Sequence, residues 1–214
     1  PVWIMPDKRR PYQEYLERVD AINALCGDGP QFYSLHLDVE PHVLPEVKRD
    51  GMEGYIPRFV ELIRDARAQA DKRGLQLEWD IPAWFGKFHD AENDCSLTET
   101  IFRYCEAVGI MAYSDTAEGQ YRVVMPNVEI AKKTGKHLMI GCETMDLDEA
   151  RREDGNCAIS YFEEGKIYMY KCLQTIMRDV AETYDAFGFA IHDVKRWIAL
   201  QPHVLPKYAE VYGK

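Results

Sequence analysis

Histidine and carboxylate side chains alternate with apolar ones in the segment Tyr33–His42, which reads YSLHLDVEPH. Successive side chains of a strand point to opposite faces, so His36, Asp38 and Glu40 share one face and the leucines and valine share the other. The Cα atoms of Asp38 and Glu40 are then about 6–7 Å apart. Neighbouring carboxyl groups push their pKa values apart, which can keep one of them protonated near neutrality. This spacing predicts acid catalysis, with Glu40 as the general acid and Asp38 tuning it.

Four other apolar segments repeat the pattern, and in each the polar set grows toward the C-terminal end. The residues singled out as catalytic or substrate-binding on these segments and just after them are Asp80, Trp84, Tyr113, Asp115, Glu143, His192 and Trp197. Trp84 and Trp197 can stack on sugar faces, whereas the parity of Trp79 places it in the core. A single carboxylate after a strand is equally consistent with an N-cap of the next helix. Five segments with the same pattern favour one acidic pocket instead.

Short apolar strands alternate with helical patterns along the whole chain. The strands are expected at Val2–Met5, Phe32–Val39, Leu75–Ile81, Val108–Tyr113, His137–Cys142 and Phe187–His192. The helices are expected at Pro11–Leu25, Met52–Arg73, Leu97–Ala107, Gln120–Thr134 and Tyr161–Tyr184, the last of them opened by a Ser160–Glu163 capping box. This rhythm predicts an α/β fold of about six parallel strands joined by crossover helices.

Two parallel architectures fit this rhythm, a doubly wound sheet and a (β/α)8 barrel. No glycine-rich phosphate loop follows an early strand, as a nucleotide-binding doubly wound fold would require. Strands covered by helices on both faces are almost continuously apolar. In this sequence every second residue of the expected strands is repeatedly polar, which a doubly wound sheet does not explain. Since a barrel places its catalytic residues at the C-terminal ends of its strands, the pattern favours the TIM-barrel type.

Length and charge exclude some classes of partner. The 214 residues suffice for one domain with a real core, and no linker or repeat divides them, so a single domain over 1–214 is expected. The net charge of −10 argues against nucleic acid, which needs clustered Lys and Arg. No apolar run reaches the roughly 18 residues that would span a membrane. The six cysteines contain no C-x-x-C zinc motif.

The strand ends LHLDVEPH, LEWDIPAWF, VGIMAYSD, HLMIGCETMD and FGFAIHDVKRW resemble those of glycoside-hydrolase TIM barrels, loosely those of the chitinase-like family 18 hydrolases. In that family strand 4 ends in Asp-x-Asp-x-Glu, whose Glu is the acid, and strand 6 ends in Met-x-Tyr-Asp. Asp38-Val39-Glu40 is similar to the end of the first motif, with His36 in place of the preceding Asp. Met111-Ala112-Tyr113 is similar to the second, with Asp115 shifted by one residue.

The resemblance implies that Asp38 lies on barrel strand 4 and that the first two strand–helix units are lacking, which leaves a C-terminal three-quarter barrel. An open barrel edge exposes unpaired backbone groups. The resemblance therefore implies a covering partner, either a second copy or a preceding N-terminal segment.

Two hydrolase schemes remain open. In the family 18 scheme the N-acetyl group of the substrate attacks and Tyr113 helps to hold it. In the retaining clan-A scheme Glu40 is the acid/base and Glu143 the nucleophile, with carboxyl groups about 5–5.5 Å apart. Both use a carbohydrate or related small molecule and no cofactor.

Two readings outside the glycosidases also remain. His, Asp and Glu side chains at the strand ends could bind a divalent metal in a barrel hydrolase or isomerase. A non-catalytic carbohydrate-binding barrel is the third possibility. Neither sugar identity nor compartment follows from the residues.

Overall fold

The computed structural model describes residues 2–3, 9–29, 31–146 and 156–203. The chain divides into two compact units, Pro1–Gly109 with Thr134–His137, and Ile110–Lys133 with Leu138–Lys214. The division falls within strand β6 (Ala107–Met111), so that three of its residues belong to the first unit and two to the second.

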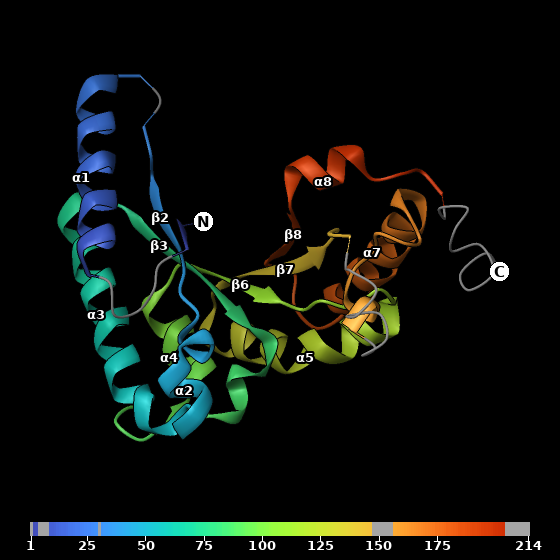
Figure 1. Cartoon of the computed structure of the whole chain (residues 1–214), viewed down its shortest axis with the longest axis horizontal. Coiled ribbons are helices and arrows are strands. Elements are labelled where there is room, and N and C mark those ends of the chain that lie inside the picture. The colour runs from blue at the N-terminus through green and yellow to red at the C-terminus, as the bar shows by residue number, and fades with distance from the viewer. Residues whose placement is uncertain (1, 4–8, 30, 147–155, 204–214) are drawn as a thin grey trace. The chain divides into compact units, whose positions relative to one another are not determined.

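The first unit is built from parallel strands and the helices that connect them (Figure 1). Its strands are β1 (Val2–Trp3), β2 (Ser34–Asp38), β3 (Gln76–Pro82) and the start of β6, and β1–β2 and β2–β3 pair in parallel. Its helices are α1 (Arg9–Cys26), α2 (Pro45–Asp50), α3 (Ile56–Arg73) and α4 (Leu97–Tyr104). Short 3-10 turns are η1 (Pro41–Val43), η2 (Glu53–Tyr55) and η3 (Ala83–Lys87), and a small antiparallel pair joins β4 (His89–Asp90) to β5 (Cys95–Ser96).

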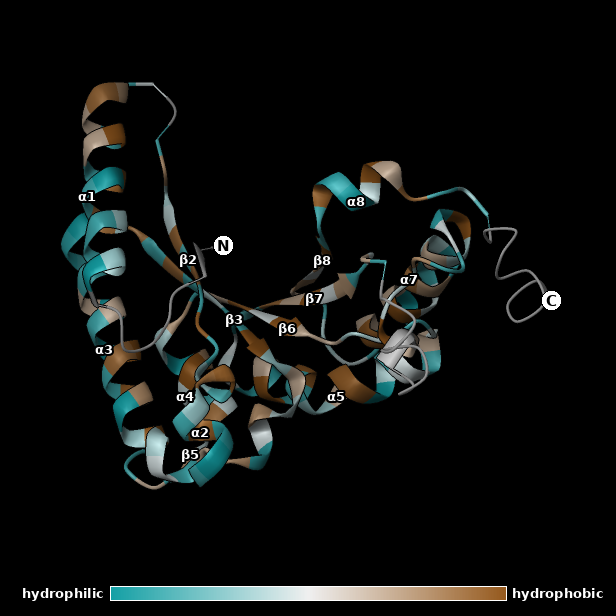
Figure 2. Cartoon of the chain, in the orientation of Figure 1, coloured by the Kyte–Doolittle hydropathy of each residue, from teal (hydrophilic) through white to brown (hydrophobic). Residues whose placement is uncertain are grey.

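The core of the first unit lies between its strands and the helices α1 and α3. Both helices alternate apolar and hydrophilic stretches (Figure 2), and an ion pair between Arg73 and Asp20, 2.8 Å long, links them. The side chains on the apolar face of β2 and β3 are buried and pack on α3. There the rings of Phe59 and Trp79 are in edge-to-face contact, with their centroids 5.8 Å apart. Trp79 is fully buried, which confirms its expected place in the core. The side chains on the polar face of the same strands are mostly only partly buried.

The second unit contains the end of β6, β7 (His137–Glu143) and β8 (Phe187–His192), and β7 and β8 pair in parallel. Its helices are α5 (Ala117–Thr134), α7 (Lys166–Ala181) and α8 (Val194–Ala199), with the 3-10 turn η4 (Asn156–Ile159) before α7. Leu138, Ile140 and Cys142 of β7 are completely buried. A buried chain of hydrogen bonds runs from the Tyr161 hydroxyl through Gln120 to the carbonyl of Gly141 and fixes the end of β7.

The strand order decides between the two parallel architectures. Among the described residues the order is β1-β2-β3-β6 in the first unit and β6-β7-β8 in the second. Apart from the small β4–β5 pair, each strand neighbours the next one along the chain. A doubly wound sheet reverses its order at a switch point, whereas a barrel runs in sequence. The chain is therefore of the α/β TIM-barrel type, and no described pairing closes β8 onto β1. The expectation of one domain over 1–214 stays a prediction.

Most expected elements are present, with shifted ends. Strand β8 has its expected bounds. Helix α3 ends at Arg73, as expected, and is followed by Gly74, whose φ of 66° makes it a left-handed C-cap. The capping box at Ser160 was wrong. The helix begins only at Lys166 with Gly165 as N-cap, because the Ser160 hydroxyl donates to the Met145 carbonyl instead. Helices α2 and α8 and the β4–β5 pair were not expected. No described helix has the length and hydrophobicity needed to cross a membrane.

Candidate active site

The polar faces of β2 and β3 form one acidic cluster in the first unit. The register places His36 opposite Glu78 and Asp38 opposite Asp80. The imidazole of His36 bridges the neighbouring strand, with Nδ1 3.0 Å from Oε2 of Glu78 and Nε2 2.9 Å from Oδ1 of Asp80. One histidine thus lies between two carboxylates of the neighbouring strand. Its buried Nε2 makes no hydrogen bond to the described residues.

Asp38 is the carboxyl group whose protonation this cluster changes most. Burial raises the pKa of Asp38 to about 7, and the negative charges of Glu40 and Asp80 add to the effect. Its Oδ1 is buried and accepts no hydrogen bond from the described residues. Gly109 gives the neighbouring Asp80 its room, since a Cβ there would lie 1.9 Å from Oδ1 of Asp80. The sequence predicted that one carboxyl of the Asp38–Glu40 pair stays protonated near neutrality, and a raised pKa of Asp38 fits that prediction.

Glu40 continues the cluster into the turn after β2. Its Oε1 lies 3.6 Å from Nε2 of His42, whose pKa is lowered by burial and partly restored by Glu40. The ring of His42 meets Trp84 edge to face at 5.0 Å. Trp84 remains 42% exposed, and the Lys87 ammonium lies 4.6 Å from the centre of its ring. The carboxyl of Glu40, the imidazole of His42 and the indole of Trp84 are therefore successive neighbours at the end of this strand. The exposed part of Trp84 is available to a ligand.

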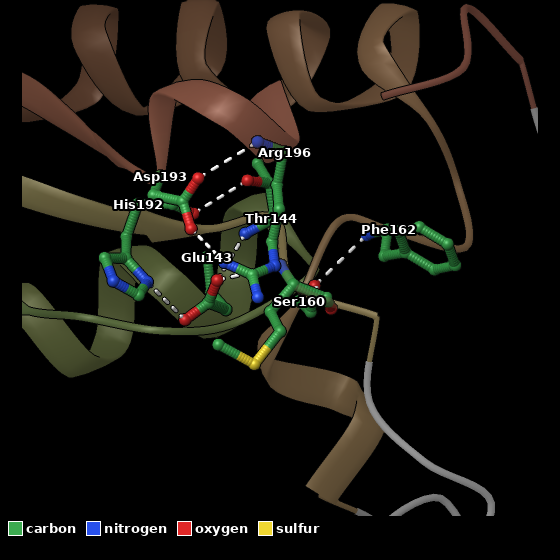
Figure 3. Close-up of polar contacts among 8 residues, drawn as sticks. Glu143, Thr144, Ser160, Phe162, His192, Asp193 and Arg196 are labelled. Atoms are coloured by element: carbon green, nitrogen blue, oxygen red, sulfur yellow. Dashed lines mark hydrogen bonds and ion pairs between the residues drawn. The ribbon is translucent and has the colours of Figure 1, made fainter. Parts of the chain in front are cut away.

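A second polar group lies at the ends of β7 and β8 in the second unit (Figure 3). Glu143 and His192 are partners in the strand register, and Oε2 of Glu143 is 2.9 Å from Nδ1 of His192. Oε1 of Glu143 accepts hydrogen bonds from the backbone N–H groups of Thr144 and Met145, both 2.8 Å long. The Glu143 side chain is 8% exposed and that of His192 51%. A buried carboxylate with both oxygens engaged therefore holds a half-exposed imidazole.

Tyr113 is close to this pair within the second unit. Its Cε1 lies 3.2 Å from the position that a Cβ on Gly141 would take, and Gly141 has the same strand parity as Glu143. A Cβ at Gly141 would also lie 2.8 Å from the backbone oxygen of Ile110, so this position favours glycine. The structure thus brings Tyr113, Glu143 and His192 to the same end of the second unit.

Asp115 belongs to a separate acidic group that also contains Glu163 and Glu164, all three buried. Burial raises the pKa of Asp115, and the charge of Glu163 adds to this. Burial raises the pKa of Glu164 to about 8, with the same sign of effect from Asp115 and Glu163. The sequence reasoning missed Glu164 and treated Glu163 as a helix cap. The pair of adjacent carboxylates before Gly165 was the only available signal.

Trp197 and Asp193 are held by their own helix and its neighbour. The indole Nε1 of Trp197 donates to the Tyr170 hydroxyl at 3.1 Å, and the Lys166 ammonium lies 5.7 Å from the ring centre. Asp193 caps α8 by accepting the N–H of Arg196 at 3.0 Å. A stacking role for Trp197 remains a prediction.

Seven of the predicted site residues thus form two groups, one in each unit, and Asp115 and Trp197 belong to neither group. Asp38, Glu40, Asp80 and Trp84 lie together in the first unit, where His42 and Glu78 join them. Tyr113, Glu143 and His192 lie together in the second. The sequence-based prediction that the two groups share one pocket stays a prediction, as does the Glu40–Glu143 separation that would mark a retaining hydrolase.

No protein-family model and no curated protein matches this sequence. Solved structures do resemble it. Catalytic domain 2 of the group II chitinase of Ostrinia furnacalis matches with 13% identity and a TM-score of 0.38, over 64% of this chain and 40% of that one. The PgaB (BpsB) glycoside hydrolase domain of Bordetella bronchiseptica matches with 12% identity and a TM-score of 0.41, over 74% and 42%.

A double mutant of the endo-beta-1,4-mannanase of Cellulomonas fimi matches with 14% identity and a TM-score of 0.47, over 91% of this chain and 43% of that one. The chain therefore spans about two fifths of the length of these structures. At these scores the resemblance to glycoside hydrolases is loose, and the fold assignment rests on the strand order of this chain itself.

Proposed function

We propose that the chain is a glycoside hydrolase that uses Glu40 and Asp38 to deliver the catalytic proton. The observation that supports this most is the raised pKa of Asp38, about 7, beside Glu40 at the end of a strand. Glycoside cleavage needs a carboxylic acid that is still protonated near neutral pH to protonate the leaving oxygen. Interacting carboxyl groups titrate as a pair, so a proton held on Asp38 is available to its neighbour Glu40.

Each residue of the first cluster has a proposed role. Glu40, at the outer end, contacts the leaving oxygen and transfers the proton. Asp38 stores that proton, and Asp80 and the charge of Glu40 keep its pKa high. Trp84, next to His42, offers its exposed portion to a sugar ring. The substrate class is therefore carbohydrate.

The test is hydrolysis of a panel of aryl glycosides, including N-acetylglucosaminides, glucosides and mannosides, by wild type and Glu40→Gln. We expect Glu40→Gln to lower kcat by about 10²–10⁴-fold, the usual contribution of general acid–base catalysis. Glu61→Gln, at an exposed position of α3, is the matched control and should change nothing. Circular dichroism should show that both variants are folded.

The pH profile gives a second arm of the same test. Wild-type activity should fall as the pH rises through about 7, because Asp38 then loses its proton. Asp38→Asn cannot store that proton, so its activity should be low at every pH and should show no limb near pH 7. Full activity of Glu40→Gln would refute the proposal, and sugar binding without turnover by the wild type would favour the non-catalytic binding barrel.

The metal-dependent alternative gains no support from the part of the chain that the structure describes. No group of three or more His, Cys, Asp or Glu side chains there has an arrangement that could hold a metal ion.

A further inference from the structure

We propose that His192 is an acid–base group. Nε2 of its imidazole takes a proton from a hydroxyl of a bound ligand or from water, and Glu143 is the residue that positions the imidazole. This replaces the role of nucleophile that the clan-A scheme gave to Glu143. The inference does not depend on the Asp38–Glu40 proposal, since all its residues lie in the second unit.

The hydrogen bonds of Glu143 carry the first step. Oε1 already accepts two backbone N–H groups, and Oε2 faces Nδ1 of His192 at 2.9 Å. A carboxylate only accepts hydrogen bonds, so Nδ1 must donate to it. The neutral imidazole then carries its free lone pair on Nε2. A carboxylate with both oxygens engaged inside the protein is poorly placed to attack a substrate but well placed to fix a histidine tautomer.

The backbone around His192 carries the second step. Thr144 donates to the carbonyl of His192 twice, from its N–H at 2.9 Å and from its hydroxyl at 2.7 Å. These two hydrogen bonds join the end of β7, which carries Glu143, to the end of β8, which carries His192. Preorganisation of this kind is what an acid–base group needs, because no reorientation is then required during proton transfer.

The exposure of His192 carries the third step. Its side chain is half exposed, whereas that of Glu143 is almost completely buried, so the imidazole has a free side for a ligand. Two charged residues that follow His192, Asp193 and Arg196, pair with each other (Figure 3). In the proposed step the O–H bond of the ligand breaks, its electron pair stays on oxygen, and a new N–H bond forms at Nε2. Glu143 then faces an imidazolium, whose charge it stabilises.

The experiment is nitrogen-15 NMR of histidine-labelled protein at a pH where the imidazole is neutral, with His192→Gln to assign its signals. We expect wild-type His192 to be the Nδ1–H tautomer. In Glu143→Gln the amide oxygen can keep the two backbone N–H bonds, which turns the amide NH₂ toward Nδ1. Nδ1 must then accept, so we expect the tautomer to invert to Nε2–H.

Carbethoxylation by diethyl pyrocarbonate, followed by mass spectrometry, gives a chemical readout of the same lone pair. Loss of a charge-assisted hydrogen bond should lower the reactivity of His192 in Glu143→Gln by roughly 10- to 100-fold. The matched control is Asp94→Asn, which makes the same change beside the exposed His89, 3.6 Å away, and should leave His192 unchanged. If Nδ1 of His192 made no hydrogen bond to Glu143, neither readout would change in a folded variant.

Two results would overturn the proposal. One is an Nε2–H tautomer in the wild type, which needs no variant to detect. The other is a folded Glu143→Gln protein whose His192 keeps its tautomer and its reactivity. Either result would leave the Asp38–Glu40 proposal unaffected.

Discussion

At the scale of single residues, burial and charge give different roles to the two carboxyl groups at the end of β2. The sequence placed Asp38 and Glu40 on one face and named Glu40 as the acid. The structure adds that burial and two neighbouring carboxylates raise the pKa of Asp38 to about 7. Parity alone could not show this, because the depth of each side chain depends on the helices and turns that cover the strand.

The raised pKa of Asp38 makes a prediction for stability. A carboxyl whose pKa is higher in the folded state stabilises that state fully below its ordinary value of 3.8, and the contribution is lost as the pH rises through about 7. Asp38→Asn should therefore be more stable than wild type above pH 7. Since water still screens part of this carboxyl, the expected difference is roughly 1–2 kcal/mol.

Chemical denaturation across this pH range measures the difference between the two proteins. It should disappear as the pH falls to 3.8. Glu61→Gln serves again as the control and should track the wild type at every pH. A constant difference between wild type and Asp38→Asn would show that the charge of Asp38 is not involved.

At the scale of elements, local sequence signals predicted the middle of each helix and strand better than its ends. Ser160 and Glu163 have the spacing of a capping box, yet Ser160 bonds to the Met145 carbonyl and the helix begins at Lys166. A serine that does cap a helix with its side chain is Ser96, which accepts the N–H of Glu99 at 3.2 Å at the start of α4. A long-range partner decided which serine caps a helix, and no local pattern contains that partner.

We therefore expect Ser96→Ala to lower the free energy of unfolding by about 1 kcal/mol, because one N–H group of α4 loses its acceptor. Thermal unfolding should show a fall of about 2–4 °C for a chain of this size. Gln174→Ala, at an exposed position of α7, is the comparison and should stay within about 0.5 kcal/mol of wild type. An unchanged melting temperature for Ser96→Ala would mean that this cap contributes nothing.

At the scale of the whole molecule, the strand order and the net charge are the informative properties. Neighbouring strands follow the order of the chain, as in a barrel and unlike a doubly wound sheet. The net charge of −10 is concentrated in part at the strand ends, where carboxylates face one another. Mutual repulsion among these groups opposes folding.

Added salt should therefore stabilise the protein. Raising the sodium chloride concentration from about 0.01 M to about 0.15 M shortens the Debye length from about 30 Å to about 8 Å and weakens this repulsion. We expect the melting temperature at neutral pH to rise by about 2–4 °C, which corresponds to about 1 kcal/mol. The rise should vanish near the isoelectric point, where the net charge is zero. A fall at neutral pH would mean that attractive ion pairs dominate instead.

The sequence by itself determined the alternation of strands and helices, the two faces of each strand and the candidate residues on the polar face. These features follow from the local periodicity of apolar and polar residues, which does not depend on where the segment lies in the fold. Only the tertiary structure decided which carboxyl retains its proton, which serine caps a helix, and that Glu143 and His192 bond to each other. Those outcomes depend on contacts between residues far apart in the chain, where burial and the nearest partner set the energy of each group.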